Sequence, residues 1–117
     1  MKRCPARFAM ALAVCVSACP AQAAPSFKTV REMARECITD DLFVTGSCSG
    51  YILGSIDTLE SARRARGEDP CLAGHVSTDD VAKQFVRAIL ADYAEKGDQP
   101  AAVLIEEIYR LKCGPAN

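Results

Sequence analysis

Cysteine and histidine are the residues of this chain whose chemistry stands out. The 117 residues include seven cysteines and one histidine. Cys71 and His75 lie four residues apart and can be interpreted as half of a metal site or as a thiolate–imidazole catalytic pair. A metal site would take further ligands from Cys37, Cys48 or Cys113, and either kind of site needs reduced cysteines. The compartment in which the protein works therefore decides how these residues are interpreted.

The N-terminal segment predicts export. Residues 1–7 carry three basic side chains and no acidic one, residues 8–16 form an unbroken apolar run, and residues 21–23 read Ala-Gln-Ala. This is the pattern of a secretory signal peptide. The apolar run is too short to span a bilayer, which takes roughly 20 apolar residues.

We predict cleavage after Ala23, which makes residues 1–23 a signal peptide and residues 24–117 a single helical domain in the periplasm. A competing interpretation is the lipobox-like sequence at 16–19, in which Cys19 becomes a lipidated membrane anchor. Cleavage after Ala23 removes three basic residues and leaves 11 of the 14 against 15 acidic ones, a net charge of −4. The domain is therefore not expected to bind nucleic acid.

Four cysteines remain after cleavage, and an even number in a short exported chain predicts two disulfides. Four cysteines allow three pairings. Antiparallel helices joined by short loops place Cys37 and Cys48 at one end of a bundle and Cys71 and Cys113 at the other. We therefore predict the pairs Cys37–Cys48 and Cys71–Cys113 and a histidine at the surface. No metal, cofactor or catalytic residue is expected.

Helical spacing of apolar residues predicts the elements that position these cysteines. A first helix over residues 27–38 is capped by Ser26, and a second covers residues 48–66 after a loop or turn at 42–44. A third begins at the capping residues 77–80 and ends at Gly97, and a fourth runs from Pro100 to Gly114. The fold class is all-α, a small antiparallel bundle of about four helices stapled by two disulfides.

One face of the second helix carries small residues and an acid. Gly50, Gly54, Asp57 and Ser61 fall on one stripe. Glycine lowers helix propensity, so that close packing of another backbone should compensate. We expect tight packing inside the bundle, with a helix pair across a dimer interface as the alternative. Asp57 is expected to be a cap or hydrogen-bond partner rather than an acid catalyst, because no second acid is placed to work with it.

Two segments of the mature domain are rich in charged residues. The basic run at residues 63–66 is interpreted as a solvated helix end. The segment with Asp92, Glu95 and Asp98 is interpreted as an acidic loop that can offer carboxylates to a basic cleft on a partner.

The segment from Ser47 to Asp57 resembles the C-x-G-Y-x-x-G-x-x-D signature of the Rap/Tai family, periplasmic immunity proteins of type VI secretion amidase effectors. The matching residues are Cys48, Gly50, Tyr51, Gly54 and Asp57. The similarity continues in order over residues 27–113. It departs from the family pattern at Ala73 and Lys112, where the family often has proline, and around Ile108-Tyr109 in the last helix.

The resemblance implies an all-α immunity protein that binds a peptidoglycan amidase effector and occludes its active site, without being an enzyme itself. It also implies that the protein can form a homodimer. The signature residues are expected to be structural, and Asp92, Glu95 and Asp98 are the candidate contacts with the amidase. The alternatives are a small acid-stress periplasmic chaperone and an envelope protein of the same fold without an amidase partner.

Overall fold

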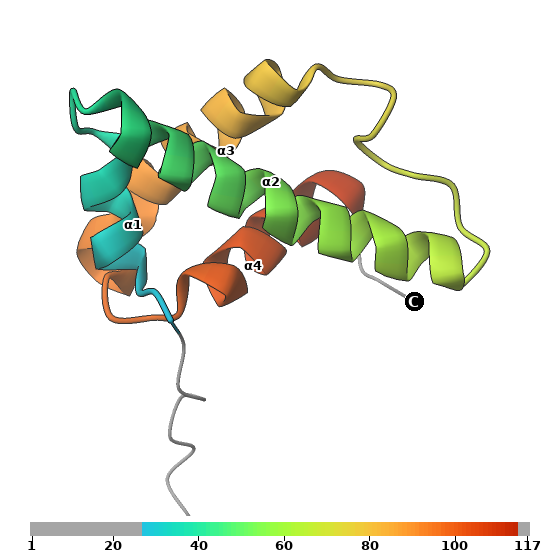
Figure 1. Cartoon of the computed structure of the whole chain (residues 1–117). Coiled ribbons are helices and arrows are strands. Elements are labelled where there is room, and N and C mark those ends of the chain that lie inside the picture. Colours follow the sequence, from blue (N-terminus) through green and yellow to red (C-terminus); the bar gives the residue numbers. More distant parts are fainter. Residues whose placement is uncertain (1–26, 115–117) are drawn as a thin grey trace, which may run out of the picture.

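The computed structural model describes residues 27–114, which form an all-α domain (Figure 1). Its helices are α1 (Val30–Cys37), α2 (Leu42–Ala65), α3 (Thr78–Lys96) and α4 (Ala101–Cys113). The predicted fold class is therefore confirmed. The predicted signal peptide, the lipidation site at Cys19 and the cap at Ser26 lie outside the described residues.

Helix α1 begins three residues later than predicted because Thr29, not a residue before Phe27, caps it. The Thr29 hydroxyl accepts a hydrogen bond from the Glu32 amide, and the Glu32 carboxylate accepts one from the Thr29 amide. This capping box satisfies two amides that would otherwise lack a partner. The residues just before α1 pair with the turn between α3 and α4, where the Val30 amide donates to Gln99 and the Ala101 amide to Lys28.

Helix α2 begins six residues earlier than predicted, so the expected loop at residues 42–44 is wrong. The Asp41 carboxylate accepts hydrogen bonds from the amides of Phe43 and Val44, which makes Asp41 the N-cap. An aspartate cap outweighs the low helix propensity of the glycine at 46. The helix ends at Ala65, one residue before the predicted end, and is followed by Gly67, which adopts a φ of 77°.

Helices α3 and α4 follow the predicted boundaries. The Ser77 hydroxyl caps α3 by accepting from the Asp80 amide, and α4 begins directly after Pro100. Between them, Gly97 is buried at a point where a side chain has no room. A Cβ there would lie 2.7 Å from Nη2 of Arg31 and 2.9 Å from the Tyr93 carbonyl oxygen. Glycine at 97 therefore lets α1 approach the end of α3.

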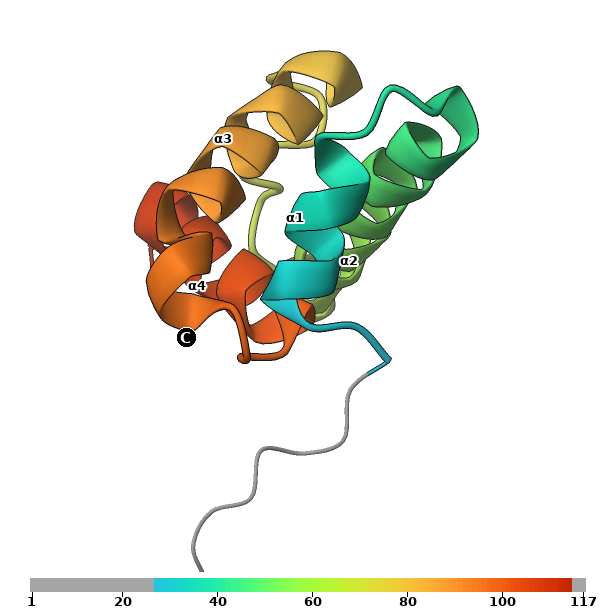
Figure 2. The same ribbon diagram turned by 90° about the vertical axis from the view of Figure 1, so that its left-hand side faces the viewer.

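The four helices share one core, since each of them contacts the other three. Figure 2 shows α1 lying against α2 on one side and α3 on the other, with α4 beneath. The largest side chains that are fully buried come from all four helices: Val30, Met33, Ile52, Phe85, Ile89, Leu104, Ile105 and Tyr109.

Two disulfides staple this core, with the predicted pairing. Cys37–Cys48 joins the end of α1 to the second turn of α2 across 11 residues. Cys71–Cys113 joins the loop before α3 to the end of α4 across 42 residues. The pairing is confirmed. Among the residues described, no helix combines the length and hydropathy that crossing a membrane requires.

Candidate functional site

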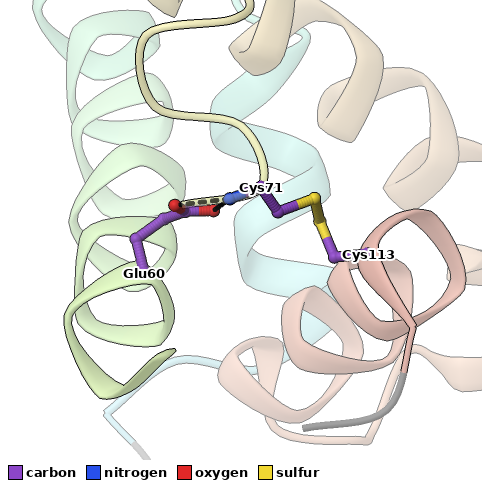
Figure 3. A group of neighbouring side chains, drawn as sticks. All are labelled: Glu60, Cys71 and Cys113. Carbon is purple, nitrogen blue, oxygen red and sulfur yellow. Dashed lines mark hydrogen bonds between the residues drawn. A yellow bond between two sulfur atoms is a disulfide. The ribbon is translucent and has the colours of Figure 1, made fainter. Parts of the chain in front are cut away.

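The most unusual side chain in the described domain is the buried carboxylate of Glu60. It is 2% exposed and accepts hydrogen bonds from the amides of Cys71 (3.0 Å) and Leu72 (3.0 Å) and from the Tyr109 hydroxyl (2.9 Å). Figure 3 shows the carboxylate of Glu60 facing the Cys71 amide beside the Cys71–Cys113 disulfide. Glu60 thus ties α2, the loop before α3 and α4 together.

The surroundings of Glu60 also raise the pKa of the Tyr109 phenol. Burial raises the pKa of Tyr109 to about 12, and the hydrogen bond that it donates to Glu60 contributes to the same shift. Tyr109 is therefore neutral at physiological pH and keeps the proton that it donates to the carboxylate.

Glu60, Cys71 and Cys113 are also the place where a metal would be sought. The ligand atoms of these three residues lie within 4.8 Å of one another. However, the two sulfurs are bonded to each other and provide no thiolate, and the carboxylate already accepts three hydrogen bonds. The donor set therefore fits a structural cross-link better than a metal site. His75, the other residue considered for chemistry, is exposed as predicted.

Sequence reasoning missed Glu60, although a signal for it was present. Cys48, Ile52, Ile56 and Glu60 recur every four residues and form the buried stripe of α2. An acid that continues an apolar stripe must find hydrogen-bond donors in the core. The stripe therefore pointed to a buried carboxylate, but not to the donors that satisfy it.

The glycine stripe of α2 lies on the opposite face, and the prediction that it packs tightly inside the bundle is wrong. Gly50 and Gly54 are exposed, and a Cβ on either would meet no atom within 4 Å. The reason is rotational: residues two positions away from the buried stripe point about 200° from it, toward solvent. Of the other signature residues, Cys48 is buried in its disulfide, and the Tyr51 ring lies 5.3 Å from the Lys28 ammonium.

Asp57 is exposed and lines a groove of about 180 Å³ beside Glu60. The expected role as a cap or hydrogen-bond partner is not met, since no hydrogen bond or ion pair joins Asp57 to the part of the chain that the structure describes. The groove lies between α2, the loop before α3 and the start of α3. Most of its walls are apolar: Leu53, Ile56, Leu72, Val76 and Val81.

The predicted acidic loop is helical instead, because α3 continues to Lys96. Asp92 and Glu95 lie on the last turns of α3, and Asp98 follows them. Lys96 lies 3.7 Å from Asp92, and Arg31 lies 3.3 Å from Asp98, so that two of the three acids are partly neutralised. Glu95 is exposed and forms no ion pair within residues 27–114.

The basic run at the end of α2 is less solvated than predicted. Arg63 and Arg66 both pair with Glu68, at 3.5 Å and 2.8 Å. Arg63 also donates to the Cys113 carbonyl, next to the second disulfide. These arginines therefore support the loop after α2.

The turn between α1 and α2 exposes three large apolar side chains that sequence reasoning did not single out as a surface. Ile38, Leu42 and Phe43 are 65%, 89% and 86% exposed, and we call them the apolar tip. The sequence showed an apolar stretch at this point, but the stretch alone does not distinguish a buried helix start from an exposed one.

A comparison with protein families identifies the fold's relatives. The family model of the Rap1a immunity proteins matches residues 29–112, which covers α1, α2, α3 and the Cys37–Cys48 disulfide, and α4 up to the residue before Cys113. No curated protein and no solved structure matches the chain. Proteins of this family are immunity proteins of type VI secretion effectors and act as inhibitors rather than enzymes. The chain therefore belongs to the Rap1a immunity protein family.

Proposed function

We propose that this protein works in the periplasm, where it binds a peptidoglycan amidase effector of a type VI secretion system and occludes the active site of that enzyme. Membership of the Rap1a immunity family is the observation that carries the proposal. The resemblance of residues 47–57 to the signature of amidase immunity proteins supports the amidase as partner. The signal-peptide pattern at 1–23 and the two disulfides support the periplasm.

The scaffold suits inhibition by occlusion. Two disulfides and a core shared by four helices hold the surface in one shape, so that little conformational entropy is lost when a partner binds. Lipidation at Cys19 would attach the same domain to a membrane that faces the periplasm without changing how it inhibits. A second copy of the chain can bind through the exposed glycine stripe of α2, which leaves the amidase contact to other surfaces.

The proposal is tested with a peptidoglycan amidase effector, which is sought first among the genes next to that of this chain. Purified mature protein, residues 24–117, is titrated into an assay of peptidoglycan peptide cleavage. We expect complete inhibition at stoichiometric amounts and competition with substrate, because an occluded active site cannot bind peptide. Cells that produce the amidase in the periplasm should survive only when the exported immunity protein is present. Binding to many unfolded proteins at acid pH, with no inhibition of the folded amidase, would instead favour the chaperone.

We further propose that Asp92, Glu95 and Asp98 contact the amidase by attracting a basic surface. Reversal of all three to lysine should lower the association rate about tenfold at low salt and leave the dissociation rate nearly unchanged, because exposed charges act mainly on encounter. Surface plasmon resonance at two salt concentrations measures both rates.

The matched control reverses Asp57, Asp69 and Asp79, three exposed acids elsewhere on the domain. Both variants change the net charge equally, so that only the position of the charges differs. If the two variants associate with the amidase at the same rate, the acids at the end of α3 are not the contact.

A further inference from the structure

Glu60, Cys71 and Cys113 bring a carboxylate and two sulfurs together at one place in the domain. The ligand atoms of these residues lie within 4.8 Å of one another, and they belong to α2, the loop before α3 and the end of α4 (Figure 3). The closed disulfide offers no thiolate to a metal. A chain gains its disulfides only in an oxidising compartment, so that the newly made chain has two thiols beside the Glu60 carboxylate.

The buried carboxylate keeps one oxygen largely free for a ligand. Oε1 of Glu60 accepts hydrogen bonds from the amides of Cys71 and Leu72 and from the Tyr109 hydroxyl. Among the residues that the structure describes, Oε2 accepts only from the Cys71 amide, at 3.0 Å. A carboxylate oxygen has two lone pairs, so that Oε2 has one left to donate to a metal. The bonds to Oε1 fix the orientation of the carboxylate, as the outer hydrogen bonds of metal ligands do.

The backbone has the spacing that two thiolate ligands need. The Cα atoms of Cys71 and Cys113 lie 5.8 Å apart. Zn–S bonds of about 2.3 Å in a tetrahedral site place two sulfurs roughly 3.8 Å apart. Rotation about the two Cα–Cβ bonds can separate the sulfurs by this much without moving the backbone. Both cysteines are only partly buried, so that water can reach the site and take a fourth position on the metal.

Ligand type and charge indicate which metal the site would take. Mg²⁺ and Ca²⁺ prefer oxygen ligands, whereas Zn²⁺ accepts thiolate and carboxylate in one tetrahedral site. Two thiolates and a carboxylate carry three negative charges, and Zn²⁺ neutralises two of them. Arg63, which pairs with Glu68, also donates to the Cys113 carbonyl at 3.4 Å and places its positive charge near the third.

We propose that Glu60, Cys71 and Cys113 bind Zn²⁺ when their disulfide is open, and that zinc then cross-links α2, the loop before α3 and α4. Each thiol gives up its proton when it binds the metal. Oxidation reverses the exchange. The two thiolates lose two electrons and form the S–S bond, a disulfide-bonded oxidant takes up the electrons and two protons to become a dithiol, and Zn²⁺ is released. The zinc site does not depend on which partner the protein binds.

The test compares two variants of residues 24–117, which exclude the cysteines of the predicted signal peptide. Cys37→Ala with Cys48→Ala keeps the proposed ligands. Cys71→Ala with Cys113→Ala keeps a pair that has no third ligand atom near it in the described domain. Each variant is reduced, freed of reductant without oxygen and titrated with Zn²⁺ against a chromogenic chelator. We expect the first variant to bind a single Zn²⁺ about 100-fold more tightly than the second.

Two further substitutions in the first variant test the ligands. Glu60→Gln replaces the carboxylate by a neutral amide, a far weaker zinc ligand, and should lower the affinity about tenfold or more while both thiolates remain. His75→Ala should leave the affinity unchanged, because His75 is exposed and is not part of the group. Equal losses in these two variants would mean that the loop binds metal without the core, and would overturn the inference.

The folded state is followed in the same titration, because an unfolded chain can bind zinc through any two cysteines. Zinc should raise the unfolding temperature of the first variant and not that of the second. If the reduced first variant is unfolded without metal, helicity by circular dichroism should return as Zn²⁺ is added. Equal affinities of the two variants, or an affinity that Glu60→Gln does not lower, would overturn the inference. No measurement here uses the amidase, so that its result is separate from that of the proposed function.

Discussion

Glu60 is the buried charged side chain of the described domain, and its hydrogen bonds explain how the core tolerates it. A carboxylate removed from water is stabilised only when donors replace the lost solvent. Two amides of the loop before α3 and the Tyr109 hydroxyl supply these donors. Arg63 of α2 holds the beginning of the same loop through the Asp69 carbonyl and Glu68, and Glu60 holds it at Cys71 and Leu72, beside the groove.

Replacement of Glu60 tests this account. Glu60→Leu leaves two amides and one hydroxyl without an acceptor, and we expect the free energy of unfolding to fall by about 3 kcal/mol. Glu60→Gln keeps one acceptor and should lose less. Urea unfolding with the disulfides intact measures both, and Glu95→Gln at an exposed site is the control. A Glu60→Leu variant as stable as the unchanged protein would contradict the role of these hydrogen bonds.

The raised pKa of Tyr109 predicts a late step in an alkaline titration. Because an unfolded tyrosine loses its proton near pH 10 and Tyr109 holds it to about 12, the stability from this group is complete below pH 10 and lost as the pH rises toward 12. Absorbance of tyrosinate should show a step near pH 12 that Tyr109→Phe removes and Tyr93→Phe keeps. A step near pH 12 that survives in Tyr109→Phe would show that it comes from another tyrosine, and would contradict the raised pKa of Tyr109.

Helix α2 combines an early start, set by the Asp41 cap, with one stripe that faces the core. Starting at Asp41 rather than at the glycines near 46–50, the helix extends toward α1 and brings Leu42 and Phe43 to the surface. Farther along the same helix, Cys48 and Glu60 face the core and Gly54 faces solvent. The apolar tip, the buried carboxylate and the exposed stripe are therefore consequences of one helix register.

Removal of the cap tests the position of this helix start. Asp41→Ala loses the acceptor for two amides, and we expect the free energy of unfolding to fall by about 1 kcal/mol. Asp40→Ala is the matched control, since Asp40 is also exposed and forms no hydrogen bond with the residues that the structure describes. Equal stability of the two variants in urea would mean that α2 begins farther along the chain.

The whole domain is held by its shared core and by two cross-links of different span. In the chain-entropy model, a disulfide stabilises by restricting the unfolded chain, and more so for a longer loop. The Cys71–Cys113 disulfide, which joins residues 42 positions apart, should therefore contribute more to stability than Cys37–Cys48, which joins residues 11 positions apart.

This ranking can be measured so that the packing change of a cysteine substitution cancels, because each variant is compared with itself in the presence and absence of reductant. Each disulfide is removed by a pair of alanines, and each variant is unfolded in urea with and without reductant. The change in the free energy of unfolding on adding reductant then measures the contribution of the remaining disulfide alone. We expect the free energy of unfolding to fall by about 4 kcal/mol when reductant breaks Cys71–Cys113 and by about 3 kcal/mol when it breaks Cys37–Cys48. The opposite order would show that native-state strain or residual structure outweighs loop length.

The sequence by itself determined the all-α class, the cysteine pairing and most helix ends. These features depend on short-range physics: apolar residues at helical spacing, the Ser77 cap, and glycine or proline where a helix stops. The pairing followed because short connections fix which helix ends are neighbours.

The tertiary structure decided what each face of a helix meets, because that depends on residues far away in the chain. Glu60 is satisfied by Tyr109, 49 residues later, and Asp98 is paired with Arg31, 67 residues earlier. The signature glycines face solvent because the opposite stripe of α2 packs against the other three helices. No local pattern reports such contacts, since a periodic stripe marks a face but not the partner that covers it.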